Sequence, residues 1–197
     1  MRRATLLVLG AALFACDRDR AADSTGPMVT NVVVQRPNVN IPLPEFAVTD
    51  QHGAPFTSQS MAGHVTIVDF VFTSCPSVCP ALTKKMSTLL ARTEDDVRLL
   101  SISVDPENDT PARMTEFLDK YGTQSPRWSF VTGEPKVVEA TVVQGFKSRV
   151  SRDQAGTLSH GEHFVVVDKA LRIRGYFDAT PSGLEDLVDL VRVLRAE

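Results

Sequence analysis

The chain has 197 residues, a formal net charge of −3 at pH 7 and a pI near 5.8. Its hydrophobic fraction of 43% is enough to build a buried core, which argues against wholesale disorder, and the length fits one ordinary domain with additional segments. The net charge is negative, and the sequence has no basic or arginine-rich run that would attract nucleic acid. A nucleic-acid partner is therefore not expected.

Residues 1–15 have the composition of an export signal. Arg2 and Arg3 precede an apolar run of about a dozen residues, which is shorter than the roughly 20 that a helix needs to cross a bilayer. The run ends in Leu13-Phe14-Ala15-Cys16, which resembles a bacterial lipobox, where the cysteine thiol is acylated and the chain is cut just before it. We therefore expect an exported protein that a lipid on Cys16 anchors to the cytoplasmic membrane, facing the periplasm or the extracellular side. A plain secretory signal or an N-terminal membrane anchor is the alternative.

Residues 16–37 are polar and follow no sustained period, and we interpret them as a flexible tether between anchor and domain. Loss of Arg2 and Arg3 with the signal changes the net charge from −3 to −5. Because an acidic surface has little attraction for anionic lipid, the lipid anchor rather than surface charge is expected to hold the protein at the membrane. The short apolar stretch 32–34 is a candidate edge strand.

The remaining residues, 38–197, alternate predicted strands and helices. Strand patterns cover 45–50, 55–57, 65–72, 97–104 and 128–131, and a hairpin that turns at Lys169-Ala170 covers 163–168 and 171–177. Helical patterns cover 81–92, 111–121, 135–144 and the C-terminal segment from 181 or 182, and a polar loop is expected at 148–159. This alternation predicts an α/β fold in which a central sheet is flanked by helices on both faces.

The segment FTSCPSVCP holds the most distinctive pattern of the domain. Cys75 stands where the buried strand 65–72 meets the start of a helix, which is the usual place for sites in open α/β sheets. Cys79 follows four residues later, so both sulfurs face the same side of the helix. A helix N-terminus stabilises a thiolate and lowers its pKa, and Pro76 suits the first helical position. A cysteine pair at the end of the first long buried strand predicts a thioredoxin-like fold with extra N-terminal strands.

Several uses of the cysteine pair stay open at this point. A structural disulfide would close a loop of only about five residues, which constrains the unfolded chain little. Dithiol oxidoreductases usually have two residues between their cysteines, whereas this chain has three. A peroxidase would carry its threonine one position earlier than Thr73. A metal site needs further ligands, and histidines are the natural candidates.

The histidines fall into two groups. His52 and His64 are expected to be solvated, whereas His160 and His163 stand at the start of the predicted strand 163–168. In a thioredoxin-like sheet the loop before this strand faces the paired cysteines. Ordinary thioredoxins place a cis-proline there, but this chain has no proline between residues 135 and 181. Two thiolates and one imidazole form a soft ligand set that suits copper as Cu(I) or Cu(II), and zinc would also accept it with a fourth ligand.

These residues resemble the Sco family, also called SenC, the exported copper proteins of cytochrome c oxidase assembly. The resemblance is carried by VDFVFTSCPSVCP, by SISVDPENDTP, by WSFVTG at 128–133, and by a late histidine ahead of a hairpin that ends in GYF. It extends over about residues 42–195 and implies a thioredoxin-like fold. Ser74 and Ser77 stand where the family often carries a histidine and an aspartate.

The resemblance also implies a ligand set and a function. The copper ligands would be the redox pair Cys75 and Cys79 together with His160, which fits the family spacing to the GYF end of the hairpin better than His163. The Asp105-Pro106-Glu107 segment would be either a loop before a helix cap or support near the site. The implied function is a metallochaperone that delivers copper to the dinuclear copper site of a cytochrome c oxidase subunit, or reduces the cysteines of that subunit. An exported thiol–disulfide oxidoreductase is the rival hypothesis.

Overall fold

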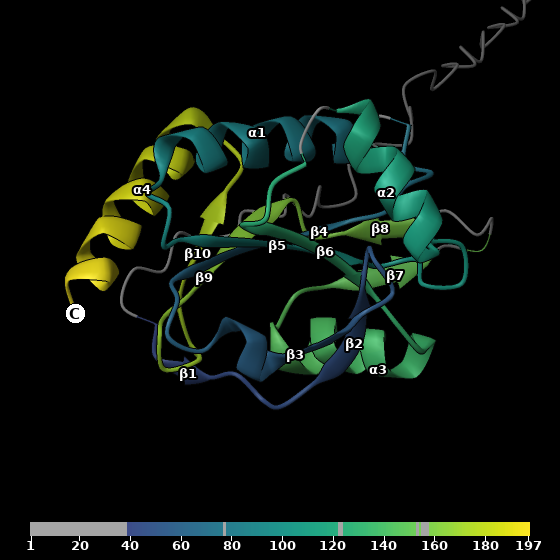
Figure 1. The fold of residues 1–197 in the computed structure, drawn as a ribbon, viewed down its shortest axis with the longest axis horizontal. Helices are drawn as coiled ribbons and strands as arrows, with labels where there is room; N and C mark the ends of the chain where they lie inside the picture. The colour runs from purple at the N-terminus through teal and green to yellow at the C-terminus, as the bar shows by residue number, and fades with distance from the viewer. Residues whose placement is uncertain (1–38, 77, 122–123, 153, 155–157) are drawn as a thin grey trace, which may run out of the picture. The chain divides into compact units, whose positions relative to one another are not determined.

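The computed structural model describes residues 39–76, 78–121, 124–152, 154 and 158–197 (Figure 1). The predicted signal peptide (1–15), the tether (16–37) with the lipidation candidate Cys16, and the candidate strand at 32–34 lie outside the described residues. None of the helices within the described ranges has both the length and the apolar character needed to cross a membrane.

An eight-stranded sheet forms the centre of the domain, in the order β1-β10-β9-β4-β5-β6-β2-β3. Its strands are β1 (Ile41–Pro42), β2 (Ala47–Asp50), β3 (Pro55–Thr57), β4 (Thr66–Val71), β5 (Arg98–Ser103), β6 (Trp128–Thr132), β9 (His163–Val167) and β10 (Arg172–Asp178). The three central strands β4, β5 and β6 are parallel, and β9 and β2 run antiparallel to their neighbours β4 and β6. The N-terminal strands therefore extend both edges of the sheet: β1 pairs with β10, and β2 with β3 extends beyond β6.

Helices cover both faces of this sheet, as the alternation of patterns predicts (Figure 1). On one face lie α1 (Val78–Arg92), α2 (Pro111–Lys120) and α4 (Pro181–Ala196), whose apolar side chains form one core with the sheet. On the other face lie the short 3-10 helix η1 (Ser58–Met61) and α3 (Pro135–Glu139), which continues as the π-helical turn η2 (Ala140–Gly145). Two cores thus sandwich the sheet, and the predicted α/β class is confirmed.

Strand β4 lies in the middle of the sheet, and all six of its residues are buried. Ile67 and Val71 belong to the core beneath α1, whereas Val68 and Phe70 belong to the core beneath α3. This alternation explains the near-continuous apolar run in the sequence, since a strand covered on both faces needs apolar side chains at every position. The parallel neighbour β5 ends level with β4, with Val71 opposite Ser103. The segments that follow both strands consequently leave the sheet at one common edge.

The predicted start of the first helix is wrong by three residues. α1 begins at Val78 rather than Ala81, which puts Cys79 inside its first turn. Pro80 is then the third helical residue, where the backbone N–H has no acceptor within the helix. A proline at this position therefore removes no helical hydrogen bond, and the helix tolerates it.

The predicted polar loop at 148–159 is also wrong. It contains a two-stranded sheet of β7 (Val150–Arg152) and β8 (Leu158–His160), in which Val150 lies opposite His160. The sequence missed these strands because they are short, mostly polar, and pair only with each other. Smaller differences are the later start of β2 at Ala47 and the conversion of the predicted helix 135–144 into α3 followed by η2.

Candidate metal centre

The two cysteines meet at the N-terminal end of α1. The Cys79 backbone N–H donates to Cys75 Sγ over 3.3 Å. This N–H is one of the helix-terminal donors that no helical carbonyl can satisfy, so the Cys75 sulfur acts as a cap for the helix. Both cysteines are thiols in the structure, with Cys79 fully buried and Cys75 partly exposed. The four-residue spacing therefore does bring the two sulfurs to one side.

His160 reaches the same place from the far end of the chain. Its Nδ1 lies 3.1 Å from the carbonyl oxygen of Gly161, and because a carbonyl can only accept, Nδ1 carries the proton. The lone pair is then on Nε2, which lies 3.5 Å from Cys79 Sγ although the two residues are 81 positions apart. The imidazole thus presents its unprotonated nitrogen to the sulfur.

The pairing of β9 with β4 explains this convergence. Val165 lies opposite Val68, so the antiparallel register carries the beginning of β9 to the end of β4. Consistent with this, the ring centroids of His163 and Phe70 are 5.7 Å apart. The residues just before β9 are therefore held beside the loop that carries the cysteines. His64 stands at the other end of β4, and His52 lies in the exposed turn between β2 and β3, so neither belongs to this cluster.

Phe72 contacts both halves of the cluster, a role that the sequence did not reveal. Its backbone N–H donates to Cys79 Sγ over 3.4 Å. Its ring packs edge-on against the His160 imidazole, with centroids 5.8 Å apart and an interplanar angle of 87°. A single residue at the end of β4 thus orients one sulfur and one imidazole.

Asp109 fixes the loop that leads to Cys75. Its carboxylate accepts hydrogen bonds from the Thr73 backbone N–H at 3.2 Å, from the Thr73 hydroxyl at 2.5 Å and from the Ser103 hydroxyl at 2.6 Å. Asp109 is fully buried, whereas the capping role at α2 falls to Thr110, which accepts from the Arg113 N–H. Asp109 therefore clamps the cysteine loop to the end of β5.

Asp105, in the Asp-Pro-Glu segment, organises the same region differently. It accepts a hydrogen bond from the Asn108 side chain at 2.9 Å and pairs with Arg152 of β7 at 3.1 Å. The segment is thus a loop before the helix cap that also ties β7 to the end of β5.

Burial sets the protonation of the cluster. Burial, the hydrogen bond with the Cys75 thiol, and the charges of Cys75 and Asp69 raise the pKa of Cys79 well above its usual range, and the Phe72 N–H offsets this only in part. Burial lowers the pKa of His160, partly offset by the Gly161 carbonyl and Glu162. At neutral pH the cluster therefore pairs a protonated Cys79 thiol, which can donate to Nε2, with a neutral imidazole. A metal bound by this sulfur must displace its proton.

Asp69 is a further buried acid, in the middle of β4. Its Oδ1 accepts from the Ser101 hydroxyl at 2.5 Å, and Ser101 in turn accepts from the Trp128 indole N–H at 2.9 Å. Its Oδ2 has no hydrogen-bond partner among the described residues. Burial raises the pKa of Asp69 from 3.8 to about 7, despite the Ser101 hydrogen bond. An acidic residue within the apolar run VTIVDFVF was the available signal.

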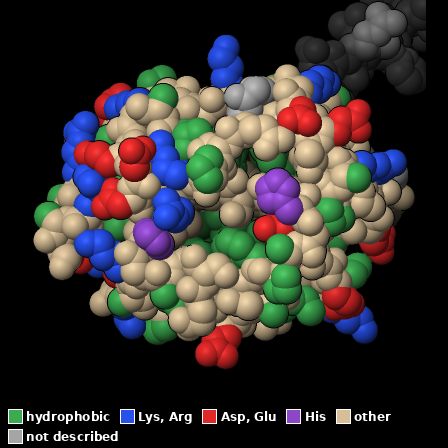
Figure 2. Space-filling model, in the orientation of Figure 1, with side chains coloured by type: hydrophobic (Ala, Val, Ile, Leu, Met, Phe, Trp, Pro, Cys, Tyr) green, Lys and Arg blue, Asp and Glu red, His purple; other side chains and the backbone are tan. Residues whose placement is uncertain are grey.

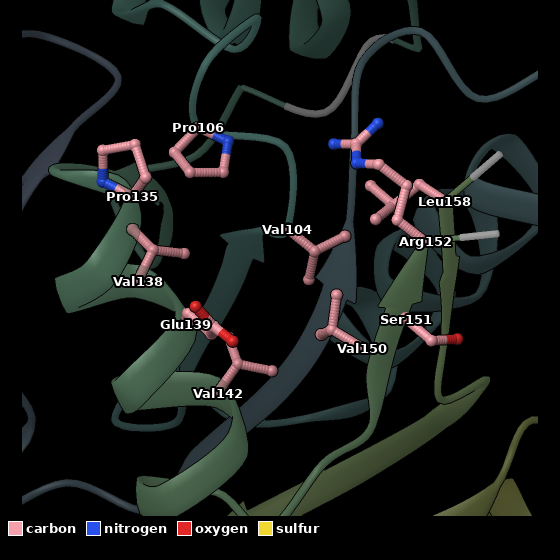
Figure 3. Close-up of a pocket in the computed structure, with 10 residues that line it drawn as sticks. All are labelled: Val104, Pro106, Pro135, Val138, Glu139, Val142, Val150, Ser151, Arg152 and Leu158. Atoms are coloured by element: carbon pink, nitrogen blue, oxygen red, sulfur yellow. The ribbon is translucent and has the colours of Figure 1, made fainter. Parts of the chain in front are cut away.

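A cavity of about 210 Å³ lies between α3 with η2 and the strands β7 and β8 (Figure 3). Side chains of α3 and η2 face those of β7 and β8 across it, and its wall reaches Leu158, two residues before His160. Its described lining is mainly apolar, with Glu139 and Arg152 as the charged members. Neither of the two thiols nor the His160 imidazole lines this cavity.

The face drawn in Figure 2 has acidic and basic side chains interspersed around a hollow with hydrophobic side chains.

The clamp can be tested by Asp109→Ala. The change leaves two donors of the half-buried Thr73 and the buried Ser103 hydroxyl without an acceptor, so we expect a loss of roughly 2–4 kcal/mol in the free energy of unfolding. Denaturant unfolding of the full-length protein measures it. Glu107→Ala, an exposed residue of the same loop, is the control and should change stability by less than about 0.5 kcal/mol. Equal effects of the two substitutions would contradict the clamp.

The buried Asp69 predicts a pH-dependent stability. The unfolded chain releases this proton near pH 4 and the folded chain only near pH 7, so ionisation of Asp69 progressively destabilises the fold across that interval. Asp69→Asn cannot ionise and should gain stability relative to wild type as pH rises from 4 to 8, by up to about 4 kcal/mol for a shift of roughly three pKa units. Denaturant titrations at both pH values give the difference. A gap between the two proteins that does not change with pH would refute this.

Comparison with known proteins places the chain among proteins of the same fold. The SCO1 protein homolog of Bacillus subtilis is 33% identical over 120 residues, which cover 59% of this chain and 62% of that protein. The crystal structure of a SCO1/SenC family lipoprotein from Bacillus anthracis has a TM-score of 0.74 at 30% identity, covering 80% of this chain and 96% of that one. Bradyrhizobium japonicum ScoI with copper bound has a TM-score of 0.65, also at 30% identity, covering 77% and 98%.

These likenesses confirm the thioredoxin-like fold predicted from the cysteine pair. The family model described as SCO1/SenC matches residues 36–194, which is most of the chain and includes both cysteines and all four histidines. The chain therefore belongs to the SCO1/SenC family.

Proposed function

We propose that this protein binds copper through Cys75, Cys79 and His160 and acts in the assembly of cytochrome c oxidase. The observation that carries the proposal is the 3.5 Å approach of His160 Nε2 to Cys79 Sγ, with Cys75 Sγ 3.3 Å from the Cys79 N–H. Two sulfurs and one imidazole thereby lie near one helix N-terminus, and the Gly161 carbonyl favours the His160 tautomer that leaves Nε2 unprotonated. A purely structural dithiol would have no need of the histidine.

Copper is the metal that this donor set favours. Thiolate sulfur is a soft ligand and imidazole nitrogen a borderline one, so the set favours copper, or zinc with a fourth ligand, over the hard cations. A solved relative, ScoI of Bradyrhizobium japonicum, is described with copper bound at 30% identity. Among the described residues no three acidic, cysteine or histidine side chains already form a closed metal site, so copper binding by Cys75, Cys79 and His160 requires these side chains to move closer together.

Cys75, Cys79 and His160 have different roles in the binding and release of copper. Copper displaces the proton of the Cys79 thiol, and the Gly161 carbonyl keeps the His160 proton on Nδ1 so that Nε2 is available. Cys75 is the more exposed ligand, so we assign it the exchange step in which copper passes to an incoming ligand of a partner. A Cys75–Cys79 disulfide would offer no thiolate, so the redox state of the pair gates loading.

Two roles in oxidase assembly fit this chemistry. The protein would deliver copper to the dinuclear copper site of an oxidase subunit, or its dithiol would reduce the cysteines of that subunit so that copper can enter. The rival is a general thiol–disulfide oxidoreductase for exported proteins. The contact between His160 and Cys79 favours the copper roles, because dithiol reduction alone does not call for an imidazole at this sulfur.

We further propose that the mature protein begins at a lipidated Cys16, after a signal peptide of residues 1–15, and that residues 16–37 tether the domain 38–197 to the outer face of the cytoplasmic membrane. The lipobox-like Leu13-Phe14-Ala15-Cys16 supports this. A relative from Bacillus anthracis is described as a lipoprotein.

The copper role and the oxidoreductase role separate in a His160→Ala variant. Loss of one ligand should lower copper affinity by more than about 100-fold, while reduction of a model disulfide by the remaining cysteines continues. Competition titration with a chromophoric Cu(I) chelator and a disulfide-reduction assay on the full-length protein measure the two effects. His52→Ala, in an exposed turn, is the matched control and should change neither. Unchanged copper affinity with loss of disulfide reduction would favour the oxidoreductase.

The anchor predicts that Cys16→Ser releases the protein from the membrane. In a bacterial host, wild-type protein should fractionate with membranes and carry the mass of a diacylglyceryl-modified N-terminus at residue 16. The Cys16→Ser protein should lack that mass, whereas Cys75→Ser should keep it. A wild-type protein that is soluble and unmodified would rule the anchor out.

A further inference from the structure

His163 is a buried histidine for which the proposed function has no use. Its side chain is 5% exposed, and neither ring nitrogen has a hydrogen-bond partner among the described residues. Burial, with a smaller contribution from His160, lowers its pKa to about 4, so the ring is neutral at ordinary pH. Buried polar groups without partners are unfavourable and uncommon, so a structural role of this ring would explain why it is buried here.

The ring packs directly against the backbone of Gly161. A Cβ atom added at Gly161 would lie 2.3 Å from His163 Cε1 and 2.5 Å from its Nδ1, and 3.1 Å from Ser148 Oγ. Separations below 3 Å are impossible for a real side chain. Only glycine therefore allows the chain to pass over the imidazole at this position.

Gly161 is also the residue that orients His160. Its carbonyl accepts the His160 Nδ1–H at 3.1 Å, and its own N–H donates to the Arg149 carbonyl at 3.1 Å. A displacement of the Gly161 backbone would therefore move the acceptor that fixes the tautomer of His160. The direction in which Nε2 points toward Cys79 would change with it.

The ring of His163 is itself held from two strands of the central sheet. Its centroid lies 5.7 Å from that of Phe70 in β4 and 5.9 Å from that of Tyr176 in β10. The Tyr176 hydroxyl donates to the Phe146 carbonyl at 3.2 Å, which fixes the tyrosine in turn. The ring therefore cannot yield easily when the backbone above it is pushed.

We infer that His163 is a positioning residue. Its ring packs against the Gly161 backbone from the side of the central sheet and so holds His160 Nε2 toward Cys79. The chain of contacts runs from the central sheet through the His163 ring and the Gly161 carbonyl to the ligand. The inference rests on the proposed role of His160 in copper binding. It assigns the second histidine of the pair to placement of the first rather than to ligation.

A Gly161→Ala substitution tests the contact. Its Cβ would collide with the His163 ring, so the full-length variant should lose at least about tenfold in copper affinity and show altered sulfur-to-Cu(II) charge-transfer bands. His163→Ala removes the support and should also weaken copper binding. In the double variant the collision is relieved, so the combined loss should be smaller than the product of the two single losses. Losses that multiply would overturn the inference.

The His160→Ala background shows whether the effect passes through His160. There, Gly161→Ala should cause no further loss of copper affinity, and a further loss would contradict the proposed route. Val165→Ala is the matched control. It removes packing from the same strand β9 without touching Gly161, so it should lower the free energy of unfolding and leave copper affinity unchanged.

A measurement without copper separates this inference from the proposed function. Nitrogen-15 NMR of the metal-free, full-length protein reports the tautomer of His160. Wild type and Val165→Ala should show the proton on Nδ1, and Gly161→Ala and His163→Ala should both shift the population toward Nε2–H. If wild type fails to bind copper but these shifts occur, the function is wrong and the positioning role stands. If neither variant changes the tautomer, the positioning role is wrong.

Discussion

The antiparallel pairing of β9 with β4 is the constraint on which the site depends. β4 delivers Cys75 and Cys79 at one edge of the sheet, and the register that sets Val165 opposite Val68 brings the residues before β9 to the same edge. His160 and Cys79 lie 81 positions apart in the chain, and this pairing brings them together. The cores on both faces hold β4 and β9 in place, so the geometry of the cluster follows from the burial of apolar strands.

Burial also determines the chemistry of the cluster. The same core that holds β4 keeps Cys79 protonated and His160 neutral, so the metal-free cluster carries little charge. In the proposed site, copper binding at Cys79 would be coupled to proton release, which would favour a soft cation that can displace a thiol proton. Asp109 and Phe72 also hold the cluster in place. Asp109 accepts hydrogen bonds from the cysteine loop, and Phe72 contacts both Cys79 and His160.

The sequence was sufficient for features that depend on local pattern. Buried strands and the cysteine pair near a helix start followed from hydrophobic runs and spacing. The preference for His160 over His163 came from the resemblance to the Sco family, and the structure has His160 Nε2 at 3.5 Å from Cys79 Sγ. The strands β7 and β8 escaped because they are short and mostly polar, and because they pair with each other outside the main sheet. The roles of Asp109 and Asp69 escaped for a related reason: a carboxylate in a sequence shows its type, but only the fold shows that Thr73, Ser103 or Ser101 will surround it.

X-ray absorption spectroscopy at the copper edge of the loaded, full-length protein is the most direct test of the site. With Cys75, Cys79 and His160 as ligands, the copper should show two sulfur neighbours and one imidazole nitrogen in the first coordination sphere, and His160→Ala should remove the imidazole scattering alone. A first sphere of nitrogen and oxygen only, or an imidazole signal that survives in His160→Ala, would contradict a site built from the ends of β4 and β8.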